Sequence, residues 1–199
     1  MKLRYKNLLA SVFAASLLVG SVTADAAGLS RAPQDNFFFA SANDPLGLDP
    51  ALVDDEEGAK ILSNLYEGLL AFKPNNTDVV PCLATSWDVS EDGKVYTFHL
   101  RQGVKFHDGT PFNAEAVKFN FDRQMPENRT PKMSYAGFVF ADVVKTDVVD
   151  EYTVKVTLSK NATPFLHNLA MSFAGPIVSP KHPIVCCYKT QNTIRIQQI

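Results

Sequence analysis

Residues 96–117 constrain the fold of this 199-residue chain more than any other stretch, because they predict a strand, a tight turn and a helix in direct succession. Residues 96–101 alternate between apolar and polar side chains, with Tyr96, Phe98 and Leu100 on one side and Thr97, His99 and Arg101 on the other. This period of two is typical of a strand with one buried face. Asp108-Gly109 then predicts a tight turn.

The helix that follows the turn has a recognisable start. Asn113 is a suitable N-cap, and Glu115 places a carboxylate in the first turn, at the positive end of the helix dipole. Val117 and Phe121 are spaced i, i+4, so they share one face of a helix that extends to about Gln124. A sheet and a helix must therefore lie close together in this fold.

Three motifs in and around this run resemble the family 5 solute-binding proteins of bacterial ABC importers, which capture peptides, nickel complexes and related solutes. Residues 62–69 resemble the family's N-x-Y-E-G-L helix, and residues 80–90 resemble its V-P-x-L-A-x-S-W-x-V-S strand. Residues 104–112 contain the V-K-F-H-D-G-T-P-F element intact. The resemblance extends from about Phe37 to Lys181.

The resemblance implies a mixed α/β (α+β) fold: the first lobe only of a type II-like periplasmic binding protein, which encloses its ligand between two lobes joined by crossover strands. We expect residues 1–26 to be a signal peptide and residues 27–181 to be the N-terminal part of the family 5 domain. Residues 182–199 resemble nothing in the family. A frameshift or a premature end explains this abrupt loss of resemblance most simply.

The N-terminus predicts export to the periplasm. Lys2, Arg4 and Lys6 precede an apolar run at residues 8–19, and Ala24-Asp25-Ala26 offers a small-residue cleavage site. A transmembrane anchor is the alternative, but the run is shorter than the ~20 residues that span a bilayer. No cysteine stands near the cleavage site, so we expect a soluble product without a lipid anchor.

Net charge bears on the kind of partner, and the cysteines bear on disulfide formation. Without residues 1–26 the chain has 16 basic and 20 acidic residues and a formal charge of −4, which argues against nucleic acid as a partner. The three cysteines are Cys82, Cys186 and Cys187. A disulfide from Cys82 to one of the other two is conceivable in an oxidising compartment, whereas the alternative is a small buried side chain at position 82.

The resemblance places the ligand-binding residues where the first core strand ends. The apolar run 37–39 predicts that strand, and residues 43–50 are rich in turn-forming residues. In the family this junction faces the ligand, which nominates Ser41, Ala42 and Asn43 through backbone groups that pair with an extended peptide. The alternative for Asn43 is that it only caps or turns the loop.

No motif indicates catalysis, a metal site or a cofactor. None of the four histidines stands in a spacing that zinc requires: His99, His107, His167 and His182. Glu67 has no catalytic partner in the sequence, so we interpret it as a solvated or hydrogen-bonded carboxylate. We interpret Trp87 as a core residue.

Further elements are expected along the chain. Asp92-Gly93 predicts a hairpin turn after Trp87, and Asp150-Glu151 predicts a second one between residues 143–149 and 152–158. Ile61, Leu65 and Leu69 predict one buried helical stripe. A short helix is expected after Pro164, followed by a stretch at residues 173–179 that returns to the core.

The resemblance therefore implies the periplasmic substrate-binding component of an ABC importer, for peptides or another small solute, with membrane permease and ATPase subunits as partners. In the peptide-binding branch the acidic residue that holds the ligand's amino terminus belongs to the later lobe, so we expect weak or no affinity. Two alternatives stay open: a non-functional or interaction-only exported fragment, and an exported enzyme. A nickel complex or haem is not distinguished from a peptide.

Overall fold

The structure is a computed structural model that describes residues 43–45, 47–181, 187–190 and 193–196. Contacts divide the chain into residues 1–40 and residues 41–199, and all described residues belong to the second unit. The strand expected at residues 37–39 and the expected signal peptide lie outside the described residues.

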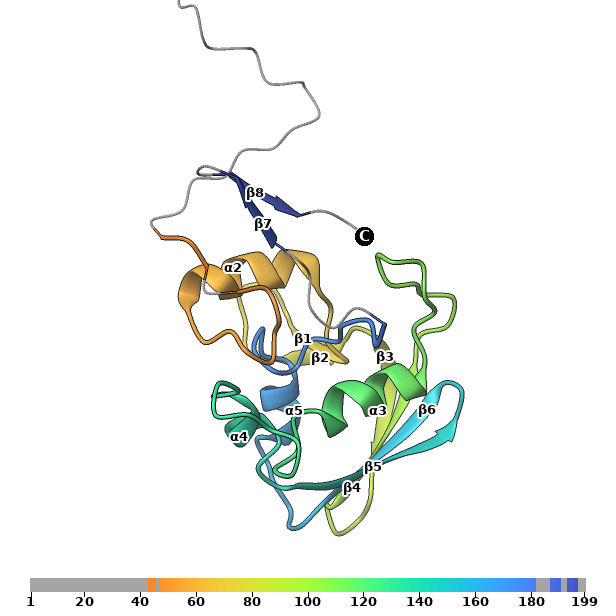
Figure 1. Cartoon of the computed structure of the whole chain (residues 1–199). Helices are drawn as coiled ribbons and strands as arrows, with labels where there is room; N and C mark the ends of the chain where they lie inside the picture. Colours follow the sequence, from red (N-terminus) through yellow and green to blue (C-terminus); the bar gives the residue numbers. More distant parts are fainter. Residues whose placement is uncertain (1–42, 46, 182–186, 191–192, 197–199) are drawn as a thin grey trace, which may run out of the picture. The chain divides into compact units, whose positions relative to one another are not determined.

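A four-stranded antiparallel sheet is the largest sheet among the described residues of this unit (Figure 1). In spatial order its strands are β3 (Ala84–Val89), β4 (Val95–Leu100), β6 (Thr153–Leu158) and β5 (Val143–Asp150). Both predicted hairpins are confirmed. Gly93 has a φ of 70° in the β3–β4 turn, a backbone conformation that glycine adopts without steric cost. The Tyr152 amide donates to Asp150 Oδ1 at 2.8 Å in the β5–β6 turn.

The predicted alternation produces the core face of the sheet. Phe98 lies opposite Val154 on the neighbouring strand, and both side chains have 0% exposure. Complete burial of such a side chain contributes about 1.5–3 kcal/mol. The core also contains the other inward-facing residues of both strands, which are Tyr96, Leu100, Val156 and Leu158.

Helix α3 (Ala114–Asp122) packs on this face of the sheet, as Figure 1 shows. Its predicted N-cap is confirmed, because Asn113 Oδ1 accepts the Ala116 amide at 3.0 Å. Val117 and Phe121 are fully buried. The α3 helix is therefore a fixed part of the core.

The other described elements are short. They are α2 (Glu56–Leu65), β1 (Leu70–Phe72), β2 (Val79–Pro81), α4 (Ala136–Val139), α5 (Phe165–Leu169), β7 (Cys187–Thr190) and β8 (Thr193–Ile196). Strands β1 and β2 pair with each other, as do β7 and β8. No helix within the described residues is long and apolar enough to cross a bilayer.

The predicted helical stripe is partly wrong. Helix α2 ends at Leu65, and Leu69 is buried outside it. Tyr66 has an extended backbone, which turns the chain towards β1. The Leu69 carbonyl accepts the amides of Cys82 and Ala84, so β-type pairing of a neighbouring segment buries this residue.

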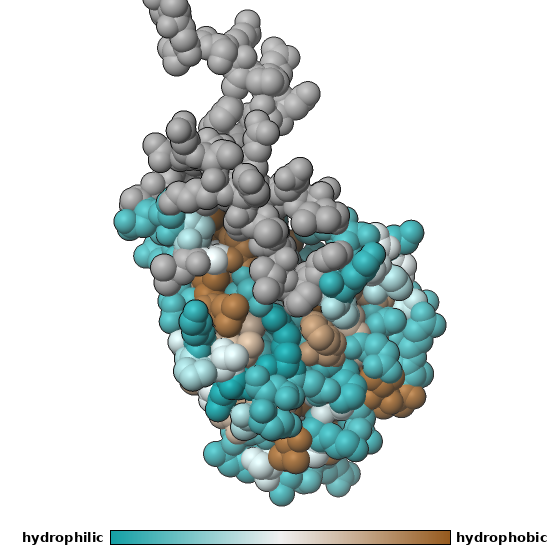
Figure 2. All heavy atoms as spheres, in the orientation of Figure 1, coloured by the Kyte–Doolittle hydropathy of each residue, from teal (hydrophilic) through white to brown (hydrophobic). Residues whose placement is uncertain are grey.

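The outer edges of the sheet are irregular. The β5–β6 register shifts between Val143 and Lys145 and again between Val148 and Asp150. Val144 and Val149, at these bulges, are more than half exposed. Bulges protect edge strands from pairing with other chains. On the face in Figure 2, hydrophobic side chains form separate small patches among hydrophilic ones.

Candidate functional site

The predicted ligand-binding residues lie where the described chain begins. Asn43 is exposed and lies in a bend, whereas Ser41 and Ala42 lie outside the described residues. The chain then continues into residues 43–53, which we call the incoming segment. Residues 173–181 leave the sheet-and-helix unit and are called the outgoing segment.

A bidentate ion pair fixes the incoming segment to α3. Arg123, just after the helix, donates from Nη1 to Asp49 Oδ2 at 2.8 Å and from Nη2 to Asp49 Oδ1 at 2.7 Å. The side chains are only 15% and 6% exposed. Asp49 Oδ1 also accepts the Ala51 amide at 3.0 Å. Parallel hydrogen bonds from a guanidinium restrict direction as well as distance, so the loop is held in one orientation.

Two buried side-chain amides, one on α3 and one just after it, fix the outgoing segment. Asn120 Nδ2 donates to the Val178 carbonyl at 2.7 Å, and Asn120 Oδ1 accepts the Val178 amide at 3.1 Å. Gln124 Nε2 donates to the Ala174 carbonyl at 3.0 Å. Both amide side chains have 0% exposure. The Asn120 side chain therefore provides both hydrogen bonds that a neighbouring strand would otherwise make to the Val178 backbone.

The two segments also contact each other and the loop after α2. The Ala174 amide donates to the Pro50 carbonyl at 2.8 Å. The Ile177 amide donates to the Glu67 carbonyl at 2.9 Å. The predicted return of residues 173–179 to the core is thus confirmed, although the residues form hydrogen bonds without a regular strand.

The V-K-F-H-D-G-T-P-F element holds the end of the outgoing segment. Asp108 Oδ1 accepts the Thr110 amide at 2.9 Å and the Thr110 hydroxyl at 2.6 Å. Asp108 Oδ2 accepts the Ser179 hydroxyl at 2.6 Å. The predicted Asp-Gly turn therefore orients a carboxylate that binds a residue 71 positions later in the chain.

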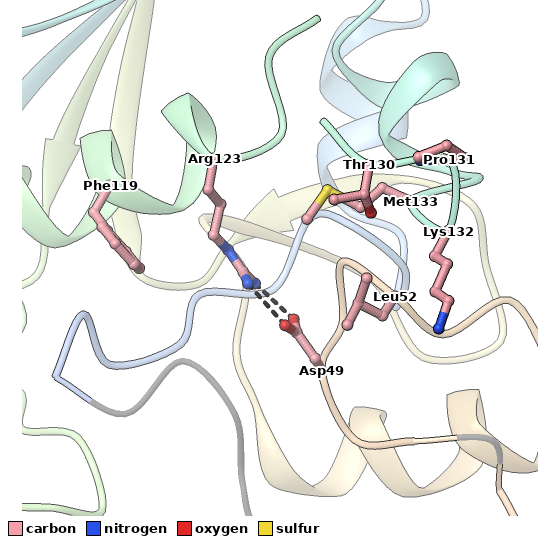
Figure 3. Close-up of a pocket in the computed structure, with 8 residues that line it drawn as sticks. All are labelled: Asp49, Leu52, Phe119, Arg123, Thr130, Pro131, Lys132 and Met133. Atoms are coloured by element: carbon pink, nitrogen blue, oxygen red, sulfur yellow. Dashed lines mark hydrogen bonds and ion pairs between the residues drawn. The ribbon is translucent and has the colours of Figure 1, made fainter. Parts of the chain in front are cut away.

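A hollow opens beside the Asp49–Arg123 pair, and we call it the Arg123 hollow (Figure 3). Its volume is about 610 Å³. The incoming segment, α3 with the residue that follows it, and the loop before α4 line it with Asp49, Leu52, Phe119, Arg123, Thr130, Pro131, Lys132 and Met133. The exposed carbon atoms make it an apolar depression with a paired charge at its centre.

Glu67 and Cys82 have structural surroundings. Glu67 forms an ion pair with Arg101, and both side chains are about half exposed. This confirms the interpretation of Glu67 as a hydrogen-bonded carboxylate. Cys82 is a free cysteine and is half-buried. Burial raises the pKa of its thiol, and the Glu67 carboxylate raises it further. A thiol that stays protonated is a poor nucleophile.

The described part of the chain contains no group of three metal-ligating side chains. His99, on the polar face of β4, contacts Asp88 Oδ2 through Nε2 at 2.8 Å across the β3–β4 pair. Trp87 is partly buried against the core, which confirms its interpretation as a packing residue.

No motif predicted a functional role for Asn120, Arg123 or Gln124. A signal for two of them existed. Asn120 and Gln124 stand at i+3 and i+7 from Val117, so both amides lie in the buried stripe of the helix that was predicted to extend to about Gln124. A buried polar residue is more informative than a buried apolar one, because it requires a partner.

The sheet, the covering helix and the two anchored connections form one lobe. Residues 78–190 match the model for the bacterial extracellular solute-binding proteins, family 5, and this match covers more than half of the chain. The chain belongs to this family.

Curated relatives have different ligands in their names. The heme-binding protein A of Haemophilus influenzae is 40% identical over 154 residues, which are 70% of this chain and 28% of that protein. The di/tripeptide-binding protein 2 of Pseudomonas aeruginosa is 39% identical over 153 residues, 69% of this chain and 29% of that protein. The chain thus spans less than a third of the length of these two relatives.

Solved structures confirm the expected fold, a partial periplasmic binding protein of mixed α/β class. The periplasmic binding protein DppA of Helicobacter pylori, in complex with the peptide STSA, matches with a TM-score of 0.63 and 37% identity. The match covers 70% of this chain and 30% of DppA.

Proposed function

We propose that this chain is the N-terminal part of the periplasmic substrate-binding component of an ABC importer, and that its solute is a short peptide. Its partners are then a membrane permease and the associated ATPase subunits. Family membership and the peptide-binding relatives support this proposal. The basic and apolar N-terminus supports export through a signal peptide.

The double anchorage of α3 is the observation that carries the proposal. Solute-binding proteins of this kind work by closure of two lobes on the ligand, which requires each lobe to move as a rigid body. Asp49 and Val178 lie on the two connections of the lobe, and both bind side chains of α3 or of the residue that follows it. We therefore expect the lobe and its connections to move as one rigid body, with bending at residues outside it.

The proposed activity is binding without chemistry. Ser41, Ala42 and Asn43 contribute backbone N–H and C=O groups to an extended peptide, which gives affinity for many side chains. The exposed position of Asn43 beside an anchored loop is compatible with this role. No cofactor is required. The matched region is a small part of each relative, so we expect weak affinity from this chain.

The experiment compares two substitutions of one residue. Proline at position 43 removes the backbone N–H, whereas alanine removes only the side chain. We expect tri-alanine to bind the exported chain with a dissociation constant of about 1 mM in calorimetry. Asn43→Ala should bind similarly and Asn43→Pro much more weakly.

Haem and a nickel–histidine complex are the competing solutes. Tighter binding of either would overturn the peptide assignment. Equal peptide affinity of Asn43→Ala and Asn43→Pro would overturn the backbone site. Absence of any solute binding would support an interaction-only fragment.

A further inference from the structure

We draw no further inference here: the strongest candidate, the apolar Arg123 hollow between the incoming segment, α3 and the loop before α4, belongs to the candidate site already described, and nothing in the structure shows which group covers it.

Discussion

Removal of the Arg123 guanidinium should destabilise the chain substantially. In Arg123→Met the carboxylate of Asp49 loses both charge-assisted hydrogen bonds, and Asp49 is only 5% exposed in the wild-type structure. The loss of one partner from a buried ion pair costs roughly 3–5 kcal/mol. Asp49 keeps the Ala51 amide as a donor, and Arg123 is not completely buried. We therefore expect the free energy of unfolding to fall by about 2–3 kcal/mol.

Urea denaturation followed by the fluorescence of Trp87, the only tryptophan, measures this change. With a slope near 2 kcal/mol per molar urea, the midpoint should fall by about 1 M or slightly more. Lys60→Met is the control, because Lys60 is exposed and pairs with the exposed Glu56 as well as with the more buried Glu57. Its effect should stay below about 0.5 kcal/mol.

A double-mutant cycle separates the ion pair from other effects of the substitution. Asp49→Asn combined with Arg123→Met should give a coupling energy above about 1 kcal/mol, since the two side chains share two hydrogen bonds. Additive effects, or a single-mutant effect no larger than that of Lys60→Met, would refute the role of this pair as the anchor of the incoming segment.

Three further changes test other parts of the structure. Asn120→Ala leaves the buried amide of Val178 without its acceptor and should cost about 2–3 kcal/mol in urea denaturation; an effect under half of that would contradict the anchorage. Phe98→Ala should cost about 3–5 kcal/mol, which calorimetry of the same variant would check. The Ser90 hydroxyl lowers the pKa of Asp92, so the Ser90–Asp92 hydrogen bond stabilises the fold above the unfolded pKa of about 3.9, and this stabilisation is lost as pH falls through the folded pKa. Ser90→Ala should raise the pKa of Asp92 in an NMR titration. An unchanged pKa would contradict the assignment of the shift to Ser90.

The central sheet could be predicted from local sequence. The alternation in β4, the turn at Asp92-Gly93 and the cap at Asn113 each depend on residues within a few positions of one another. These local signals favour the same strand, turn and helix start that the complete fold contains, so they could be interpreted without knowledge of distant contacts. The same holds for the β5–β6 hairpin.

The anchors of the lobe could not be predicted in this way. Asn120 meets Val178 across 58 positions, and Arg123 meets Asp49 across 74. The sequence shows a polar residue in an apolar stripe, but it does not show which segment satisfies it. The end of α2 was misplaced for a different reason: Leu69 is buried by β-type pairing with residues 82–84, which helical periodicity does not describe.

The central claim is that α3 unites the lobe with both of its connections. Amide hydrogen exchange tests it directly at Ala174 and Val178, whose amides bind the Pro50 carbonyl and Asn120 Oδ1. We predict that both amides exchange as slowly as those of β4, through unfolding of the whole lobe. Exchange at the rate of an exposed loop, while the amides of β4 stay protected, would contradict the account.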